Sequence, residues 1–271
     1  MMTLDEGGWR RPNVRAVTPP AALRDVVEFL WLDEWPAESA LARPFRVVAD
    51  DAAHILWYLN GDRVLRTDRI AIAGARGWHC DVNLSGRQLM VGARLVPGAI
   101  PALFGVSASA LTNHSVPLGQ MGVRGVRRVA SRDSVLDDLS SLIEGMRRRR
   151  VVDSRAAWIA GQARSGTTSV GSFARLFEMP PRSVRAWSAR TLGLGLKRLL
   201  KIRRLHAALE LRLSGAHDTW GQIAAAAGYA DQSHLVRDCR GLLGESPGEF
   251  LARSTRAEPR NLTHDQAEAR R

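Results

Sequence analysis

Cysteine is scarce in this sequence: the 271 residues hold only Cys80 and Cys239, which form no C-x-x-C pair. A disulfide framework and a zinc site are therefore not expected, and the composition fits a reducing compartment. No window approaches the roughly 18 consecutive apolar residues of a transmembrane helix. Residues 1–14 lack the apolar core of a secretory signal. We therefore expect a cytoplasmic protein that is not secreted and does not span or bind a membrane.

Sequence patterns of common enzymes are also missing. There is no Walker loop, no H-E-x-x-H and no G-x-S-x-G. His79 and Cys80 are neighbours on an expected strand, so their side chains point to opposite faces and cannot easily pair as base and nucleophile. Asp50 and Asp51 lie beside a strand and are expected to cap a turn. We expect no catalytic residue and no cofactor.

Positive charge is concentrated in one half of the chain. Residues 1–120 hold 12 Arg and no Lys against 12 acidic residues, so the whole formal net charge of +12 lies from residue 121 onward. Coding bias explains the preference for Arg over Lys but not this asymmetry. A polyanionic partner is therefore expected at the C-terminal half. The composition, with 45% hydrophobic and 24% charged residues, is that of a globular protein.

The stretch 219–251 has the pattern of two short helices joined by a tight turn. Gly228 suits a left-handed helix end, and Asp231 suits the N-cap of the second helix. One face of that helix is apolar, with Leu235, Cys239 and Leu242. The other face carries Ser233, His234, Arg237 and Arg240. A buried stripe backed by a polar, cationic face is what a recognition helix in a DNA major groove requires, although a purely structural helical hairpin remains the alternative.

This stretch resembles the second helix-turn-helix of the AraC/XylS transcription regulators. The family pattern is I-A-x-x-x-G-[FY]-x-[DS]-Q-x-[HY]-[FL]-x-R-x-F-[RK]-x-x-x-G-x-[ST]-P-x-x-[FY]. The matching residues are Ile223, Ala224, Gly228, Tyr229, Asp231, Gln232, His234, Leu235, Arg237, Arg240, Gly244, Ser246, Pro247 and Phe250. Cys239 stands where the family usually has Phe, which predicts a slightly underfilled core. The resemblance suggests an activator, while the residues themselves leave the sign of regulation open.

Short stretches typical of strands dominate residues 1–120, separated by turn signals such as Asn60-Gly61-Asp62. Such spacing favours a small β-barrel or sandwich. Strands are expected at residues 28–32, 45–49, 54–59, 69–73, 78–82 and 88–95, followed by helices at 99–104 and 108–111.

This half resembles the cupin-like sensory barrels of some AraC-like regulators, which carry the signature G-x-R-[FL]-x-P-G. It is matched by Gly92, Arg94, Leu95, Pro97 and Gly98. Such a barrel can enclose a small-molecule effector. Its candidate lining residues are Trp31, Trp57, Tyr58 and Trp78, with a plain structural core as the alternative. A metal-binding cupin needs an H-x-H pair, which this half lacks, so no metal is expected.

Residues 134–146 have the pattern of an amphipathic helix. Its apolar stripe consists of Val135, Leu139, Leu142, Ile143 and Met146. In regulators of this type such helices commonly mediate dimerisation, so a homodimer is one interpretation; packing on the chain's own barrel is the other. The run Arg147–Arg150 follows and is either a solvated hinge or a contact to DNA phosphates.

Residues 170–178 and 181–192 form a second helix-turn-helix candidate. Its outward-facing residues are Arg182, Ser183, Ala186 and Arg190, with Arg185 at the edge. It resembles the first AraC-type module less closely, since Ala186 replaces a usual Arg, Ser188 a usual Phe and Leu196 a usual Pro. This module is therefore expected to bind DNA less strongly or less specifically.

A strong helix expected over residues 196–213 joins the two modules. At 1.5 Å per residue it spans about 27 Å, enough to hold two recognition helices about one DNA turn, ~34 Å, apart. One rigid chain can thus read two consecutive groove segments. Two modules joined in this way, within the basic half of the chain, argue against the structural-hairpin alternative.

The sequence therefore predicts an α+β protein: a small N-terminal β-barrel, cupin-like, followed by an all-α C-terminal domain with two helix-turn-helix modules. The expected units are residues 1–120, a linker at 121–152, the DNA-binding domain at 153–254 and a polar, disordered tail at 255–271. The expected function is sequence-specific binding of double-stranded DNA in transcription regulation. Its expected contacts are Arg182, Ser183, Arg185, Arg190, Gln232, Ser233, His234, Arg237 and Arg240. A nucleic-acid-associated enzyme with a catalytic barrel and a non-specific architectural DNA binder are the alternatives.

Overall fold

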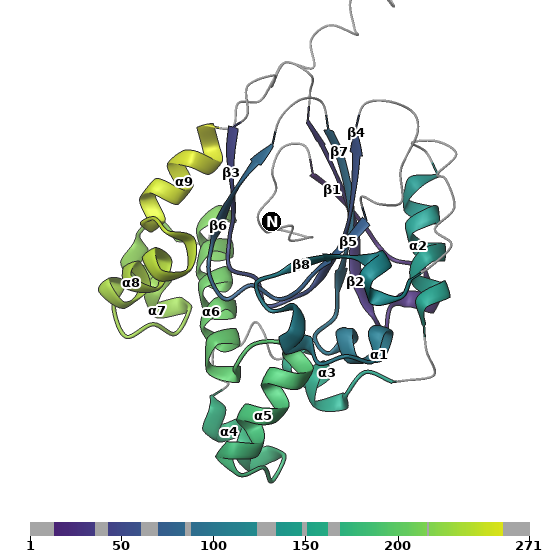
Figure 1. The fold of residues 1–271 in the computed structure, drawn as a ribbon. Helices are drawn as coiled ribbons and strands as arrows, with labels where there is room; N and C mark the ends of the chain where they lie inside the picture. The colour runs from purple at the N-terminus through teal and green to yellow at the C-terminus, as the bar shows by residue number, and fades with distance from the viewer. Residues whose placement is uncertain are drawn as a thin grey trace, which may run out of the picture.

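The first half of the chain is rich in strands and the second half is helical (Figure 1). The α+β class is therefore confirmed. None of the helices described below combines the length and the apolar character that crossing a membrane requires. The structure, a computed structural model, describes residues 14–35, 43–60, 70–84, 88–123, 134–147, 151–161, 169–215 and 217–256.

An antiparallel six-stranded sheet, in the order β1-β2-β7-β4-β5-β8, organises the N-terminal half. Near its middle, Val91 of β7 lies opposite Leu32 of β2 and Trp57 of β4. A separate antiparallel pair is formed by β3 and β6. The strands are β1 (Val14–Val17), β2 (Val27–Trp35), β3 (Arg43–Val47), β4 (His54–Asn60), β5 (Ile70–Ala73), β6 (Cys80–Leu84), β7 (Gln88–Leu95) and β8 (Ser115–Pro117).

The sheet is not closed into the expected barrel. In the described part of the chain, β3 and β6 pair only with each other, and the larger sheet ends in β1 and the three-residue β8. Closure requires every strand to keep a matching stagger and tilt relative to its neighbours. Here Val48 and Ala49, directly after β3, join the core of the helical half. After β3 the chain therefore passes into the core of the helical half rather than directly into the six-stranded sheet.

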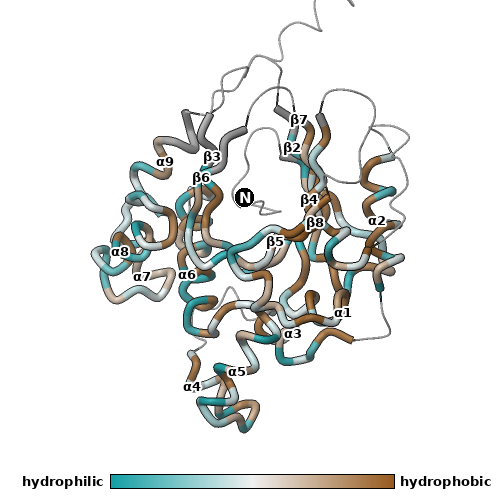
Figure 2. The backbone as a smooth tube through the Cα atoms, viewed as in Figure 1, coloured by the Kyte–Doolittle hydropathy of each residue, from teal (hydrophilic) through white to brown (hydrophobic). Residues whose placement is uncertain are grey.

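Alternating residues give the six-stranded sheet two apolar faces. Ile55 and Trp57 lie in the core covered by helices α1 (Ala99–Phe104) and α2 (Val135–Met146), whereas Trp31 and Leu56 pack on the opposite face. Figure 2 shows the hydrophobic character of β4 and β5. Four of the five residues in the apolar stripe of α2 are buried in this core and Leu142 is partly buried against it, so packing on its own domain is the interpretation that is confirmed.

Helices make up the C-terminal half, and each helix-turn-helix unit begins with a capping box. In one, Ser169 and Ser172 exchange hydrogen bonds; in the other, Thr219 and Gln222 do so. Residues 148–150 of the basic run and 257–271 of the expected tail lie outside the described part of the chain. The helices are α3 (Ser154–Gly161), α4 (Val170–Leu176), α5 (Pro181–Leu192), α6 (Leu196–Leu213), α7 (Trp220–Ala226), α8 (Gln232–Leu243) and α9 (Pro247–Arg256), with short 3-10 turns in the N-terminal half at η1 (Ala21–Leu23), η3 (Ala108–Leu111) and η4 (Leu118–Met121).

Long helix α6 forms the spine of the helical half, as expected for residues 196–213. Figure 1 shows it between the β3–β6 pair and helices α7 to α9, with α4 and α5 near one end. Its buried residues Leu199, Ile202 and Leu205 share a core with both helix-turn-helix units. The same core includes Val48, Ala49 and Ala75 from the strand-rich half, so the two halves are packed together.

Candidate nucleic-acid interface

Helix α8 is well defined at both ends. The side chain of Asp231 accepts a hydrogen bond from the backbone N–H of His234 at 2.7 Å, and Gly244 ends the helix with a left-handed φ of 77°. Its inner face is fully buried through Leu235, Cys239 and Leu242. Its outer face exposes Gln232, Ser233, Arg237 and Arg240. The helix therefore presents a polar, cationic strip that is held from behind by an apolar one.

His234, also expected to contact DNA, lies differently from these four residues. It is partly buried, and its ring meets the ring of Tyr229 edge-on with centroids 5.1 Å apart. Arg204 of α6 lies over the Tyr229 ring, with its guanidinium carbon 5.5 Å from the ring centre. His234 thus helps to hold the turn between α7 and α8.

An ion pair fixes the orientation of α8 on the spine helix. Lys201 Nζ lies 2.7 Å from Asp238 Oδ1, and the Asp238 side chain is only 6% exposed. Because a buried carboxylate needs a partner, this pair opposes rotation of α8 about its own axis. Lys201 of α6 therefore links the spine helix to α8.

Helix α5 resembles α8 in layout. Pro181 occupies its first turn and Gly193 ends it with a φ of 80°. Exposed side chains along it are Arg182, Arg185, Ala186 and Arg190, while Ser183 is partly buried. Val184, Trp187 and Ser188 form the buried side. Both candidate recognition helices thus show the expected division into an inner and an outer face.

A carboxylate behind α5 holds this helix as Asp238 holds α8. Asp153 Oδ2 accepts hydrogen bonds from Trp187 Nε1 at 2.8 Å and from Arg155 at 2.6 Å. The hydrogen bond from Arg155 and, to a smaller extent, that from Trp187 lower the pKa of Asp153 to about 2. The Arg155 guanidinium also lies over the Trp187 ring, 5.2 Å from its centre. Asp153 also caps the start of α3, because its side chain accepts a hydrogen bond from the Arg155 backbone N–H at 2.9 Å.

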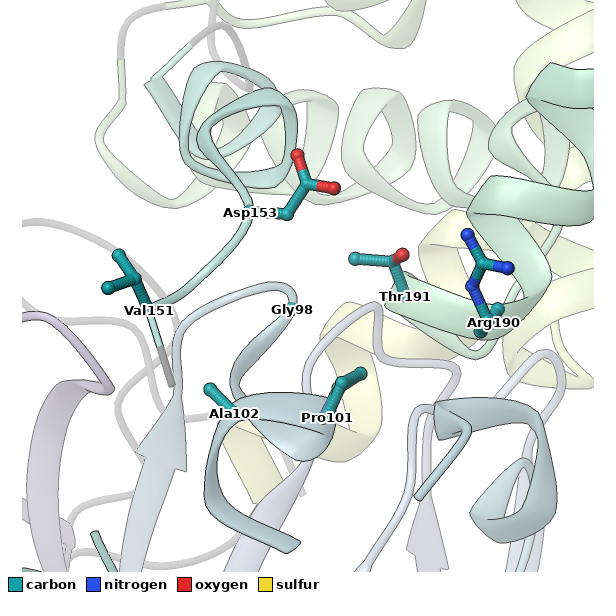
Figure 3. Close-up of a pocket in the computed structure, with 7 residues that line it drawn as sticks. All are labelled: Gly98, Pro101, Ala102, Val151, Asp153, Arg190 and Thr191. Atoms are coloured by element: carbon teal, nitrogen blue, oxygen red, sulfur yellow. The ribbon is translucent and has the colours of Figure 1, made fainter. Parts of the chain in front are cut away.

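Arg190 lies on the rim of a pocket of about 420 Å³ between the two halves of the chain. Figure 3 shows Arg190 and Thr191 of α5 opposite Pro101 and Ala102 of α1. The complete lining is Gly98, Pro101, Ala102, Val151, Asp153, Arg190 and Thr191. The C-terminal turn of α5 is therefore next to the N-terminal half, whereas its first turn is not part of this pocket.

Only two of the four aromatic residues proposed to line an effector pocket, Trp31 and Tyr58, lie on the same face of the sheet. Trp57 is buried in the core beneath α1 and α2, and Trp31 is buried on the opposite face of the sheet with Tyr58 beside it. Trp78 is 52% exposed, in the segment before β6. Trp31 covers Gly92 so closely that a Cβ atom there would lie 2.2 Å from Trp31 Cζ2.

A buried charged cluster joins the two halves, and sequence reasoning missed it. Arg94 on β7 donates to both carboxylate oxygens of Asp50, at 2.6 and 2.7 Å, and to Asp51 at 3.0 Å. Arg203 of α6 donates to Asp51 from the other side at 2.5 Å. His54 Nε2 lies 2.9 Å from Asp50. Asp50 also accepts from the backbone N–H of Ala52 at 3.0 Å, so the expected turn-capping role is confirmed.

Opposite charges keep this cluster ionised. Burial would raise the pKa of Asp50, but Arg94 and His54 outweigh it and hold the pKa well below its usual range. Burial acts on Asp51 in the same way, and Arg203 and Arg94 lower its pKa. Burial would lower the pKa of Arg94, yet Asp50 and its neighbouring carboxylates raise it well above the usual value. For His54, burial dominates and lowers the pKa, so the imidazole is neutral at pH 7.

Comparisons with known proteins address both halves. Residues 173–253 match the model of a family described as a helix-turn-helix domain, and residues 15–117 match a family described as a domain of unknown function (DUF6597). No curated protein matches the chain. The helix-turn-helix match contains both α5 and α8, together with α6 between them.

Among solved structures, the chain is similar to ToxT from Vibrio cholerae. An apo variant is 11% identical, covers 82% of this chain and 97% of its own, and gives a TM-score of 0.46. A second ToxT crystal form is 10% identical, covers 82% and 98%, and gives 0.45. ToxT with bound unsaturated fatty acid is 11% identical, covers 82% and 94%, and gives 0.44. The family match places the helical half among transcription regulators rather than enzymes. Residues 173–253 form an AraC-type helix-turn-helix domain, and the chain is a DNA-binding transcription regulator.

Proposed function

We propose that the chain binds DNA sequence-specifically, with α5 and α8 in successive segments of the major groove. The observation that supports this most directly is that α6 carries two helices, each with an exposed polar face opposite a fully buried one. Helices of this kind enter a major groove with their first turns against the bases. We place α8 as the main reader because its exposed face holds two arginines and a glutamine, and α5 carries Ala186 at a usual arginine position.

The proposed central contacts are those on the exposed faces. They are Arg182 and Arg185 in α5, with the partly buried Ser183 beside them, and Gln232, Ser233, Arg237 and Arg240 in α8. Arginine can bond guanine with two parallel hydrogen bonds and glutamine can do so with adenine. We place Arg190 and His234 at the edge of the interface, because Arg190 borders α1 and His234 packs against Tyr229.

We also propose that the N-terminal half controls this binding, in response to a small molecule. Support comes from its position, since it contacts α5, α6 and the end of α8. A homodimer would need a surface other than the α2 stripe, which is already buried. The proposed place of action is the cytoplasm. A reporter gene placed beside a bound site would show whether the chain activates or represses transcription.

The test begins with selection of genomic fragments by the purified full chain, which yields a preferred site. Affinities of Arg237→Ala are then compared with wild type on that site and on a scrambled duplex at one salt concentration. We expect a loss of about 5- to 150-fold on the site, because a good arginine–guanine pair contributes about 1–3 kcal/mol of discrimination. On the scrambled duplex, where Arg237 has no matching guanine to lose, the loss should stay within about twofold.

Arg15→Ala is the matched control, since it removes one exposed arginine from β1, in the strand-rich half. It should bind both duplexes as wild type does. Equal losses of Arg237→Ala on both duplexes would assign Arg237 to a phosphate. Equal affinities of the wild type for both duplexes would make the chain a non-specific binder and overturn the proposed function.

A further inference from the structure

The N-terminal half touches the C-terminal end of recognition helix α5. Thr112, directly after η3, donates its hydroxyl hydrogen to the carbonyl oxygen of Gly193, with an oxygen–oxygen distance of 2.5 Å. Gly193 itself lies so close to the backbone of Ala108 that a Cβ atom there would be 3.2 Å from the Ala108 carbonyl oxygen. This end of α5 is therefore seated on η3.

The C-terminal end of recognition helix α8 is held by the same half. The backbone N–H of Ala49 donates to the carbonyl oxygen of Leu242, in the last turn of α8, at 3.4 Å. Carbonyl groups in that turn lack partners within the helix, so this bond satisfies one of them. His79 lies against Gly244, where a Cβ atom would be 2.5 Å from the imidazole Nε2. Both recognition helices are thus contacted at the same end.

The helix between them is held more strongly. Arg203 of α6 donates to Asp51, His206 Nε2 lies 3.0 Å from the carbonyl oxygen of Ala49, and Arg198 donates to the carbonyl oxygen of Gly77 at 2.8 Å. The Arg203 and Asp51 side chains are only 10% and 2% exposed.

Because the contact between the N-terminal half and α6 contains buried charges, α6 cannot shift along it freely. Arg94 and Asp50 complete the cluster around Asp51, and each of the three is at most 6% exposed. A displacement of α6 by a few ångströms would separate the buried Arg203 side chain from Asp51 and leave that carboxylate to share Arg94 with Asp50, which is unfavourable for charges out of water. The interface therefore has one favoured arrangement, and α6 with its two recognition helices is fixed in that arrangement.

The N-terminal half contacts the last turns of the recognition helices, away from the first turns that are proposed to enter the groove. The first turns, with Arg182 in α5 and with Gln232 and Ser233 in α8, are exposed. A helix in this class of motif reads bases with its N-terminal residues. The N-terminal half can therefore stay in place while both helices lie in the groove.

We propose that the N-terminal half sets the spacing between the two recognition helices, with Asp51 and Arg203 as its positioning residues. This inference rests on the proposed function, in which α5 and α8 both read DNA. Its consequence is that the spacing of the two DNA segments is selected by contacts that never touch DNA. Loosening the cluster should widen the range of spacings that the chain accepts.

The experiment compares the preferred duplex with one that has a single base pair inserted between the two segments. One base pair shifts them by about 3.4 Å and turns them by about 35°. The wild type should lose about tenfold or more in affinity on the inserted duplex, the effect of about one mismatched base pair. Asp51→Asn and Arg203→Met should reduce that discrimination by about three- to tenfold, whatever their absolute affinity. A purely structural role would lower both affinities equally and leave the ratio unchanged.

Asp25→Asn is the matched control, because Asp25 forms an exposed ion pair with Arg147 within the N-terminal half and α2. Asp25→Asn should keep the wild-type ratio of affinities for the two duplexes. Arg203→Lys, which retains the charge, should keep most of the discrimination that Arg203→Met loses. Thr112→Val tests the same proposal if the cluster variants do not fold, since it removes only one hydrogen bond at the end of α5.

Two failures are distinguishable. A wild type that binds its site but tolerates the insertion overturns the positioning role alone, as do variants with an unchanged ratio. A wild type with no preferred site overturns the proposed function, and the positioning role with it.

Discussion

The substitution Arg94→Met removes the cation around which the buried carboxylates at the domain interface are arranged. Arg94 is 6% exposed and donates to Asp50 and Asp51. Removing one partner of a buried ion pair costs about 3–5 kcal/mol, because the remaining charge stays buried without compensation. Asp51 keeps Arg203 and Asp50 keeps His54, so we expect a loss near the lower end, about 3 kcal/mol of unfolding free energy at pH 7.

The pH dependence of this loss has a defined sign. In the wild type, the lowered pKa of Asp50 and Asp51 means that their contribution is present at neutral pH and is lost as the pH falls through the folded-state pKa. The lowered pKa of His54 also costs the wild type stability once the pH falls below about 6.5. In the variant, Asp50 loses Arg94, the largest influence that lowers its pKa, so burial should raise that pKa; a carboxyl group with a raised pKa gains stability as the pH falls. The difference between the two proteins should therefore shrink from pH 7 to pH 5.

Urea unfolding of both proteins at pH 7 and pH 5 measures this difference. Arg94→Lys serves as the control, because it keeps the charge but not the two-pronged geometry, and its loss should be smaller at both pH values. A loss below about 1 kcal/mol at pH 7, or a difference that grows on acidification, would refute the account of the cluster as ionised and mutually compensated.

Three further experiments, two substitutions and one labelling assay, test other parts of the structure. Gly92→Ala should lower the unfolding free energy by about 1–3 kcal/mol in urea, because its methyl group would overlap the Trp31 ring; an unchanged midpoint would contradict the packing of that ring. The Cys239 thiol, which is buried with its pKa raised by burial to about 12, should resist a thiol reagent at pH 8 until denaturant is added, and fast labelling of the native chain would be inconsistent with this. Asp153→Asn should lower the free energy of unfolding by about 1 kcal/mol, a small value because the Asp153 carboxylate is partly exposed to solvent. Because the folded pKa of Asp153 is lowered to about 2, that cost should be present above about pH 4 and vanish towards pH 2; the same difference at both pH values would show that its charge is unimportant.

Local signals in the sequence predicted the helices well. The ranges expected for α1, α5 and α6 coincide with Ala99–Phe104, Pro181–Leu192 and Leu196–Leu213, because apolar periodicity and end signals such as Gly193 lie within each element. The strand β7 was predicted for the same reason. Strands β1 and β8 were missed, since four and three residues are too few to show an alternating pattern.

The contacts between the halves could not be predicted in this way. Arg94 and Asp50 are 44 residues apart, and Arg203 and Asp51 are 152 residues apart, so no local pattern joins them. Asp50 did give a correct turn-capping prediction, which is the local part of its role. Exposed positions in α8 were predicted because they depend only on the helical period. The burial of Trp31 and Trp57 on opposite faces depends on the open sheet, which strand spacing alone does not distinguish from a barrel.

The core shared by the two halves bears on how the chain unfolds. Val48, Ala49 and Ala75 are buried among residues of α6 to α8, while the matched helix-turn-helix family begins only at residue 173. A fragment that starts there would uncover the apolar patch on which these three residues rest. The unit that folds cooperatively is therefore larger than the unit that the family defines, and heat should melt the strands and the recognition helices in a single transition.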